Sequence, residues 1–186
     1  METRQFKCDF KTRAEGEEKR IEGYFAVFGG VYEITNTMSE SIDPHAFDET
    51  LEDDIRALTN HDTTLVLGRT AAGTLSLKVD EQGLFGSILV NPNDTDALNL
   101  YERVQRGDVN QCSFGFDILA EETEFGENGE IHFNIKKVKL YEVSCCTFPA
   151  YKDTSIQARA AHGEELLKAR GQKWKEGMLA RLKGDH

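Results

Sequence analysis

Two stretches decide the fold: SFGFDIL at residues 113–119 and IHFNIKKVKLYEVSCCT at residues 131–147. Both are rich in aromatic and β-branched residues, and their apolar side chains alternate with others, which is typical of strands. In the second stretch the apolar residues change phase at Lys136-Lys137. This change predicts a β-bulge there, or a strand that changes sheets.

More strands are predicted toward the N-terminus. IEGYFAVF, residues 21–28, is a β-type run that ends before two glycines. TLSLKV at residues 74–79 alternates cleanly, and a turn at Gln82-Gly83 leads into another apolar run over residues 84–90. These last two runs are predicted to pair as a hairpin.

Two helices are predicted between the strands. Asp43-Pro44 supplies an N-cap and a first-turn proline, which predicts a short helix through about Leu51. Residues 94–106 carry an apolar stripe at helical spacing, and Gly107 ends it. Many strands with two inserted helices favour an α+β domain that resembles a mainly antiparallel β-barrel flanked by helices.

The C-terminal tail differs from the rest of the chain in charge. From residue 159 onward there are seven Lys or Arg and four Asp or Glu, although the whole chain has a formal net charge of −11. We therefore expect a body over residues 1–158 and a basic, helical tail over residues 159–186, with breaks at Gly171 and Gly177. Two interpretations stay open: the tail docks on the body, or it binds a partner surface.

Composition excludes several classes of protein. The acidic charge argues against nucleic acid as a partner, because phosphate binding needs a basic surface. The sequence has no apolar run near the roughly 20 residues that span a membrane. The first residues, METRQFKCDF, are charged and lack the apolar region of a secretory signal, so we expect neither export nor membrane insertion.

The cysteines are expected to be buried free thiols in a reducing cytosol. Two of them are adjacent in sequence, and neither a CxxC pair nor another zinc pattern is present. The four positions are Cys8, Cys112, Cys145 and Cys146.

Ser113 is a candidate nucleophile. In a strand, Phe114 and Phe116 point to one face and would fill the core, whereas Ser113 and Gly115 are expected to be exposed on the opposite face. The glycine lets another backbone or a substrate approach. Taken alone, the pattern is a weak signal, because most serines beside a strand glycine are structural.

His61 and Glu142 are candidates for the groups that would activate such a serine. A neutral histidine can accept a hydroxyl proton near pH 7. Glu142 lies among bulky strand residues, and a buried carboxylate needs a partner. Orienting a histidine is one such pairing. The competing interpretations are a loop histidine hydrogen-bonded to a neighbour and a structural salt bridge to an Arg or Lys.

Taken together and in order, these residues resemble the prohead serine proteases of tailed bacteriophages and prophages. The resemblance spans roughly residues 20–158. It is carried by GYFAVF (23–28), DPHAFDETL (43–51), ALTNHD (57–62), VLGRT (66–70), GTLSL (73–77), LYERVQRGDVNQCSFGF (100–116) and LYEVSCCTFPAYKDTSI (140–156). The stretch VYEITNTMSES before DPHAF departs from the family's pattern.

The resemblance implies a fold related to the herpesvirus capsid protease assemblin, a β-barrel wrapped by helices. It implies that Ser113 is the nucleophile, His61 the base and Glu142 the third member. The reaction would be endopeptidase acyl transfer without a metal or organic cofactor. The substrates would be the major capsid protein, the scaffold polypeptide and the protease itself, inside the assembling prohead in the bacterial host cytoplasm. Homo-oligomerisation is left open, and so is autocleavage of the tail.

Three further functions compete with this one. Cys112 raises the possibility of a cysteine protease, but strand alternation places it on the Phe114 face. A metal hydrolase using His45 and His61 has no ligand motif behind it. A catalytically inactive, scaffold-like binding domain would keep the fold without the reaction.

Arg69 is expected to form a structural ion pair. Backbone amides near residues 142–147 are candidates for an oxyanion hole by resemblance alone.

Overall fold

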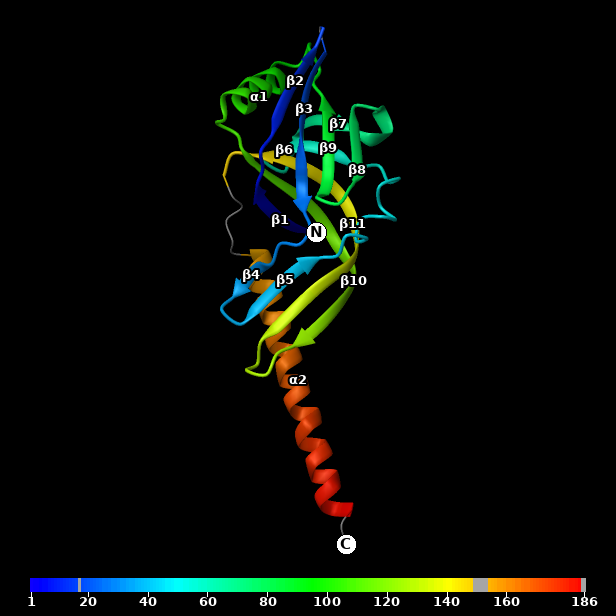
Figure 1. The fold of residues 1–186 in the computed structure, drawn as a ribbon, viewed down its shortest axis with the longest axis vertical. Helices are drawn as coiled ribbons and strands as arrows, with labels where there is room; N and C mark the ends of the chain where they lie inside the picture. The colour runs from blue at the N-terminus through cyan, green and yellow to red at the C-terminus, as the bar shows by residue number, and fades with distance from the viewer. Residues whose placement is uncertain (17, 149–153, 185–186) are drawn as a thin grey trace.

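The structure is a computed structural model that describes residues 1–16, 18–148 and 154–184. In chain order its elements are β1 (Glu2–Lys7), β2 (Lys11–Glu15), β3 (Glu18–Val27), β4 (Tyr32–Thr35), β5 (Met38–Ile42), β6 (Arg56–Thr59), β7 (Asp62–Arg69), the 3-10 turn η1 (Thr70–Ala72), β8 (Leu75–Val79), β9 (Gly83–Leu89), α1 (Thr95–Arg106), β10 (Gln111–Phe125), β11 (Ile131–Cys146) and α2 (Thr154–Gly184). The strands form one elongated body, and α2 leaves it at one end (Figure 1).

The longest strands, β10 and β11, form a curved antiparallel hairpin that runs through the body (Figure 1). Their register skips Leu119 of β10 and Lys136 of β11, which confirms the bulge predicted from the phase change. β11 also changes neighbours beyond this point. Residues 131–135 pair in parallel with β5, whereas residues 142–145 pair in parallel with β6.

The first sheet has the order β1-β10-β11-β5-β4, with β6 on the far half of β11 and β7 on β6. β1 runs antiparallel to β10 over its whole length. The short β6–β7 turn at Asn60-His61 therefore lies beside the C-terminal end of β11. This topology brings the segments that carry Ser113, His61 and Glu142 to one region of the sheet.

The second sheet has the order β2-β3-β9-β8 and includes the strand predicted over residues 21–28 and the hairpin predicted over residues 74–90. Its apolar side chains join one core with those of the first sheet. Burying a phenylalanine fully is worth roughly 1.5–3 kcal/mol, so the aromatic residues dominate this core. Its fully buried phenylalanines are Phe25, Phe47, Phe114 and Phe116. Phe133 is also fully buried, but in a second, smaller cluster with Met38 and Ile131.

The helix predicted over residues 94–106 is confirmed as α1. The Asp94 side chain accepts hydrogen bonds from the amides of Asp96 and Ala97, and Gly107 ends the helix at φ 89°. Its predicted apolar stripe is the face that packs on the core. The buried residues of that stripe are Ala97, Leu100, Tyr101 and Val104.

The predicted barrel is not what the strand pairing forms. Among the described residues the first sheet ends in β1, β4 and β7 and the second in β2 and β8, so neither sheet closes on itself or joins the other. The α+β class is confirmed, with mostly strands and two helices. A count of strands does not determine which edges pair, and closure depends on that pairing.

The predicted helix after Asp43-Pro44 is wrong. Residues 44–52 form successive turns. In these turns the amides of Ala46, Asp48 and Thr50 each donate a hydrogen bond to the carbonyl three residues earlier. The helical bonds are replaced by bonds to β11. The amide of Val138 donates to the Ala46 carbonyl at 3.0 Å, and the amide of Leu140 donates to the Thr50 hydroxyl at 2.9 Å. Tertiary hydrogen bonds thus override the local capping signal.

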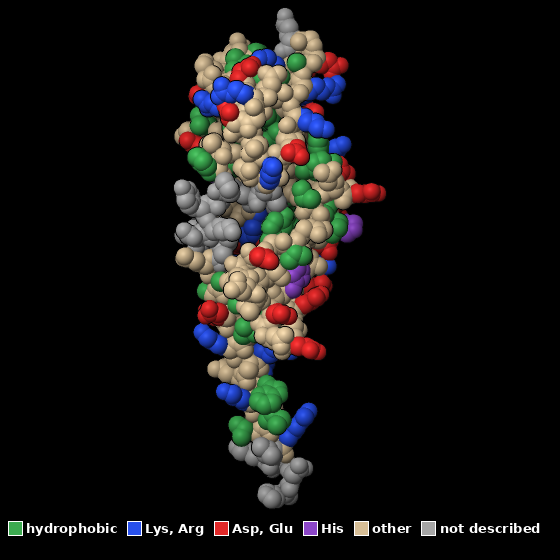
Figure 2. Space-filling model, turned by 60° about the vertical axis from the view of Figure 1, so that its left-hand side comes forward, with side chains coloured by type: hydrophobic (Ala, Val, Ile, Leu, Met, Phe, Trp, Pro, Cys, Tyr) green, Lys and Arg blue, Asp and Glu red, His purple; other side chains and the backbone are tan. Residues whose placement is uncertain are grey.

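α2 is one unbroken helix, so the predicted breaks at Gly171 and Gly177 are wrong. A glycine inside a helix costs roughly 0.5–1 kcal/mol, which weakens a helix without ending it. The first turns pack on the body, where Arg159 and Gly163 are buried. Hydrophobic side chains gather farther along α2 (Figure 2), and the exposed ones are Trp174, Met178 and Leu179. Neither described helix has the length and apolarity to cross a membrane.

Candidate active site

Ser113 lies near the start of β10, on the face opposite the core. Phe114 and Phe116 are fully buried in the core and stack with ring centroids 4.7 Å apart, which confirms the predicted strand phase. The predicted exposure of Ser113 is wrong, because its side chain is 0% exposed. Its hydroxyl donates a hydrogen bond to the Arg4 carbonyl of β1 at 2.9 Å. The N-terminal strand, which sequence reasoning did not predict, therefore engages this hydroxyl.

His61 occupies the two-residue turn between β6 and β7. Asn60 and His61 have φ values of 53° and 62°, a left-handed pair that makes a tight hairpin turn. Asparagine tolerates this conformation, but a histidine there is uncommon. The turn is held by Asn60, whose amide donates to the Cys145 carbonyl at 3.0 Å and whose side-chain oxygen accepts from the Thr147 amide at 2.9 Å. Backbone strain of this kind often marks functional sites.

Glu142 lies on β11 and is 4% exposed. One carboxylate oxygen is 2.7 Å from His61 Nδ1, and the other accepts a hydrogen bond from the Ser144 hydroxyl at 2.5 Å. Since a carboxylate only accepts hydrogen bonds, Nδ1 carries the proton in this pair. In a neutral imidazole the other nitrogen, Nε2, is then the acceptor. The predicted pairing of Glu142 with a histidine is what the structure contains.

The Nε2 atom of His61 is buried and has no hydrogen-bond partner among the residues that the structure describes. An unpaired buried polar atom costs free energy, and native structures keep few of them. Such atoms are commonly explained by a reactive role or by a missing ligand. No hydrogen bond joins His61 to Ser113 in the described part of the chain, because the Ser113 hydroxyl is turned to Arg4.

Ser144 is a site residue that sequence reasoning missed. It pairs directly with Ser113 across the β10–β11 ladder, and its hydroxyl accepts a hydrogen bond from the His61 amide at 3.2 Å. The same hydroxyl donates to Glu142, so it joins the histidine turn to the carboxylate. Strand alternation was the available signal, because residues 142 and 144 share one face of β11.

Gly115 leaves room for the carboxylate. It pairs with Glu142 in the ladder, and a Cβ atom on it would clash with a Glu142 carboxylate oxygen. Any side chain at this position would displace the group that contacts His61. The glycine of SFGF is therefore required by the site itself, rather than by backbone conformation.

Comparison with known proteins places the chain in a family. A sequence model of the caudovirus prohead serine protease family matches residues 7–169. The chain belongs to this family. It is 30% identical over 165 residues to the prohead protease of Enterobacteria phage HK97, in an alignment that covers 86% of this chain and 69% of that protein. It is also similar to the solved structure of the bacteriophage T4 capsid assembly protease, with 12% identity, a TM-score of 0.43, and coverage of 80% of this chain and all of that one.

The four cysteines of this prohead protease family member are buried, as predicted. The Cys112 thiol donates to the Tyr24 carbonyl, and its pKa is raised by a hydrogen bond with Cys8 and by burial. Burial also raises the pKa of Cys145 well above its usual value. The thiolate is the nucleophilic form, so these shifts argue against a cysteine mechanism.

His45 and Arg69 form surface ion pairs and do not contribute to the site. His45 is exposed, and its Nδ1 atom is 3.0 Å from a carboxylate oxygen of Asp48. Arg69 forms the predicted ion pair, with Nε 2.6 Å from Asp54. Within the described residues no group of three or more His, Cys, Asp or Glu side chains could hold a metal ion. The residues considered for a metal hydrolase therefore do not come together in this prohead protease fold.

Proposed function

We propose that this chain is a serine endopeptidase in which Ser113 is the nucleophile, His61 the general base and Glu142 the group that orients it. The observation that carries the proposal is the His61–Glu142 pair. It fixes the proton on Nδ1 and leaves Nε2 buried and unpaired among the described residues, on the sheet face that Ser113 shares. This is the tautomer that a base acting on a serine requires.

The reaction would proceed by acyl transfer. His61 Nε2 takes the Ser113 proton as Oγ bonds to the carbonyl carbon of the substrate peptide. The imidazolium, stabilised by Glu142, then gives that proton to the leaving amine as the C–N bond breaks. Water releases the acyl group as a carboxylate and restores the serine. Donors to the developing oxyanion would account for roughly 3 kcal/mol each, and amides near residues 142–147 remain the candidates.

The proposed substrates are the major capsid protein and the scaffold polypeptide. The family is that of the caudovirus prohead serine proteases, and the relative from phage HK97 is named a prohead protease. By that likeness this chain would act inside the assembling prohead in the bacterial host, with self-cleavage as a further reaction. The 159–186 tail would be removed by self-cleavage or would direct the enzyme to the shell.

Co-expression with the neighbouring capsid gene tests this function. The intact mass of the capsid protein should fall when the wild-type chain is present. It should stay at full length with Ser113→Ala and with His61→Ala. The matched control is Ser76→Ala, which changes an exposed serine on β8 and should leave cleavage intact. Identical capsid-protein masses with wild type and Ser113→Ala would instead support an inactive, scaffold-like domain.

A further inference from the structure

β1 lies against the strand of the nucleophile as an extended peptide would. It pairs antiparallel with β10 from Lys7 opposite Gln111 to Glu2 opposite Phe116. The match to the protease family begins only at residue 7, the last residue of β1. Proteins that bind extended peptides often take them up as an added strand, with main-chain bonds giving affinity and side-chain pockets giving specificity.

One peptide bond of β1 stands at the nucleophile. The Arg4 carbonyl oxygen is 2.9 Å from Ser113 Oγ, and its carbonyl carbon is only one bond, about 1.23 Å, beyond that oxygen. The bond that follows this carbonyl joins Arg4 to Gln5. Arg4 is thus placed as the residue whose carbonyl carbon Ser113 would attack to form the acyl-enzyme. In this structure the Ser113 hydroxyl donates its proton in a hydrogen bond to the Arg4 carbonyl. His61 would have to remove that same proton.

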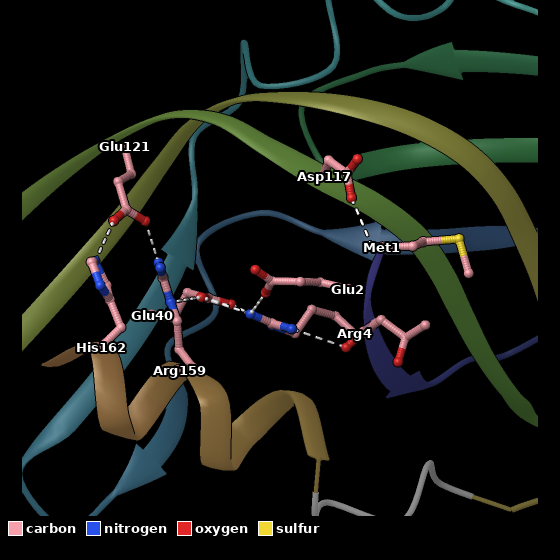
Figure 3. Close-up of polar contacts among 9 residues, drawn as sticks. Met1, Glu2, Arg4, Glu40, Asp117, Glu121, Arg159 and His162 are labelled. Atoms are coloured by element: carbon pink, nitrogen blue, oxygen red, sulfur yellow. Dashed lines mark hydrogen bonds and ion pairs between the residues drawn. The ribbon is translucent and has the colours of Figure 1, made fainter.

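The Arg4 side chain lies between the carboxylates of Glu40 and Glu2 (Figure 3). Its Nε and Nη2 atoms lie 2.5 Å and 2.9 Å from the two carboxylate oxygens of Glu40, which is a bidentate pair. Glu40 is 0% exposed and Arg4 only 9% exposed. The guanidinium also lies 5.4 Å from the centre of the Phe116 ring, within cation–π range. Planar, bidentate and aromatic contacts select arginine over lysine.

Three of the charged groups around Arg4 come from outside β1. Glu40 also accepts a hydrogen bond from Arg159 of α2 at 2.9 Å, and Arg159 contacts Glu121 at 2.5 Å (Figure 3). With His162, which is 3.5 Å from Glu121, counted as neutral, the two carboxylates and one guanidinium carry one net negative charge. That charge matches one incoming cation, and Arg159 neutralises part of the buried charge.

We propose that β1 occupies the groove of the substrate strand, and that Glu40 is the specificity-determining residue for an arginine immediately before the cleaved bond. The inference rests on the proposed serine protease function and adds the class of substrate. The substrate is a polypeptide strand with an arginine whose carbonyl meets Ser113. Such a strand comes either from a separate protein or from the chain's own N-terminus, by cleavage between Arg4 and Gln5.

Cleavage after the arginine would use the same acyl-transfer steps as the proposed reaction. Ser113 Oγ bonds to the arginine carbonyl carbon, the bond to the next residue breaks, and the freed amine takes the proton carried by His61. Water then yields a new C-terminal arginine. For β1 itself the products are residues 1–4 and a chain that begins at Gln5.

Two peptides test, on the full-length enzyme, whether Glu40 selects arginine. A fluorogenic peptide containing ETRQFK and the same peptide with alanine for arginine are compared on wild type, Ser113→Ala and Glu40→Gln. The arginine peptide should show a kcat/KM roughly ten- to a hundredfold higher, the effect of losing a charged hydrogen-bonded pair. Glu40→Gln should bring this ratio close to one. Equal rates for the two peptides on wild type overturn the inference, and that comparison does not depend on how Glu40→Gln folds.

Arg4→Ala tests whether β1 covers the serine. It should speed labelling of Ser113 by a fluorophosphonate probe, because β1 loses its buried anchor. The matched control Arg13→Ala changes an exposed arginine on β2 and should leave the labelling rate unchanged. Equal labelling of wild type and Arg4→Ala would overturn the covering role.

Failure of the arginine inference can be distinguished from failure of the proposed protease function. A serine that labels and a capsid protein that is cleaved, combined with no preference for arginine, overturn this inference and leave the protease function standing. An unlabelled serine in wild type and Arg4→Ala, with uncut capsid protein, overturns both. The intact mass of the wild-type chain identifies the source of the strand. A chain beginning at Gln5 assigns it to the N-terminus, and an intact chain with arginine-selective activity assigns it to a separate polypeptide.

Discussion

At the scale of single residues, Glu142 connects the groups of the site. Its carboxylate contacts His61 on one side and Ser144 on the other, and it lies against Gly115 across the ladder. Ser144 and Gly115 act through Glu142 rather than on a substrate. Substitutions at these two positions should therefore affect activity more than stability, because their contacts hold the carboxylate in place.

Gly115→Ala should lower kcat/KM by about 100-fold, because the added Cβ displaces the Glu142 carboxylate from His61 and misplaced catalytic groups cost about that much. Assay of peptide hydrolysis beside the melting temperature checks this. Gly171→Ala on α2 is the matched control, since a Cβ there meets nothing within 4 Å. It should keep full activity and stabilise the helix slightly. Normal activity in Gly115→Ala would contradict the role given to Glu142.

Ser144→Ala should lower kcat/KM about tenfold, because the His61 amide loses its acceptor and Glu142 loses a donor. Peptide hydrolysis is the measurement, and Ser144→Thr, which keeps the hydroxyl, should restore the rate. A rate in Ser144→Thr as low as that in Ser144→Ala would contradict the role given to the hydroxyl.

The sequence was sufficient to select His61, Ser113 and Glu142 as candidates, because strand phase and family-like blocks converge on them. It was not sufficient for Ser144 or for the burial of Ser113. Ser144 acts through a hydrogen bond across the sheet, and Ser113 is engaged by a strand more than 100 residues away in the chain. Both depend on tertiary register, which a local pattern does not contain.

At the scale of elements, β11 organises the structure through its neighbours. One half pairs with β5 and the other with β6, so the turn that carries His61 is fixed relative to Glu142. β11 also determines the conformation of residues 44–52. These residues accept hydrogen bonds from β11 and form turns in place of the helix that Asp43-Pro44 predicted. The type of an element was predicted correctly where packing and local signals agree, as in α1. The prediction was wrong where they compete.

Asp43 ties those turns to β11 through Lys136, whose ammonium is 2.7 Å from the carboxylate. This hydrogen bond holds the pKa of Asp43 below its ordinary value. A lowered folded-state pKa contributes stability above the unfolded pKa of about 3.9, and that stability is lost as pH falls through the folded value. Asp43→Asn should therefore cost about 0.5–1.5 kcal/mol at neutral pH, and the gap to wild type should close below about pH 4. Urea unfolding at several pH values checks this, and a gap independent of pH would contradict it.

At the scale of the whole molecule, β1 and the first turns of α2 meet at one buried charge. Arg4 of β1 and Arg159 of α2 share Glu40 beneath the β10–β11 hairpin (Figure 3). The sequence indicated an α+β body and a helical tail, but neither this junction nor the open sheets in place of a barrel. Pairing between the first, the last and the middle elements is non-local, and composition does not determine it.

Arg159→Ala should destabilise the chain by about 1.5–3 kcal/mol, because it removes charged hydrogen bonds to Glu40 and Glu121 from a residue that is 6% exposed. Urea unfolding measures the change. The control is Lys168→Ala on the same helix, an exposed pair with Glu164 that is worth under about 0.5 kcal/mol. Equal stabilities of the two variants would mean that the first turns of α2 do not dock as described.

The proposed reaction requires Ser113, activated by His61, to form the acyl-enzyme. Tandem mass spectrometry of the full-length chain after treatment with a fluorophosphonate tests this, in wild type, Arg4→Ala and His61→Ala. We predict one adduct, on Ser113, in wild type and more rapidly in Arg4→Ala, and none in His61→Ala. An adduct on another residue, or labelling of Ser113 that persists unchanged in His61→Ala, would contradict the account.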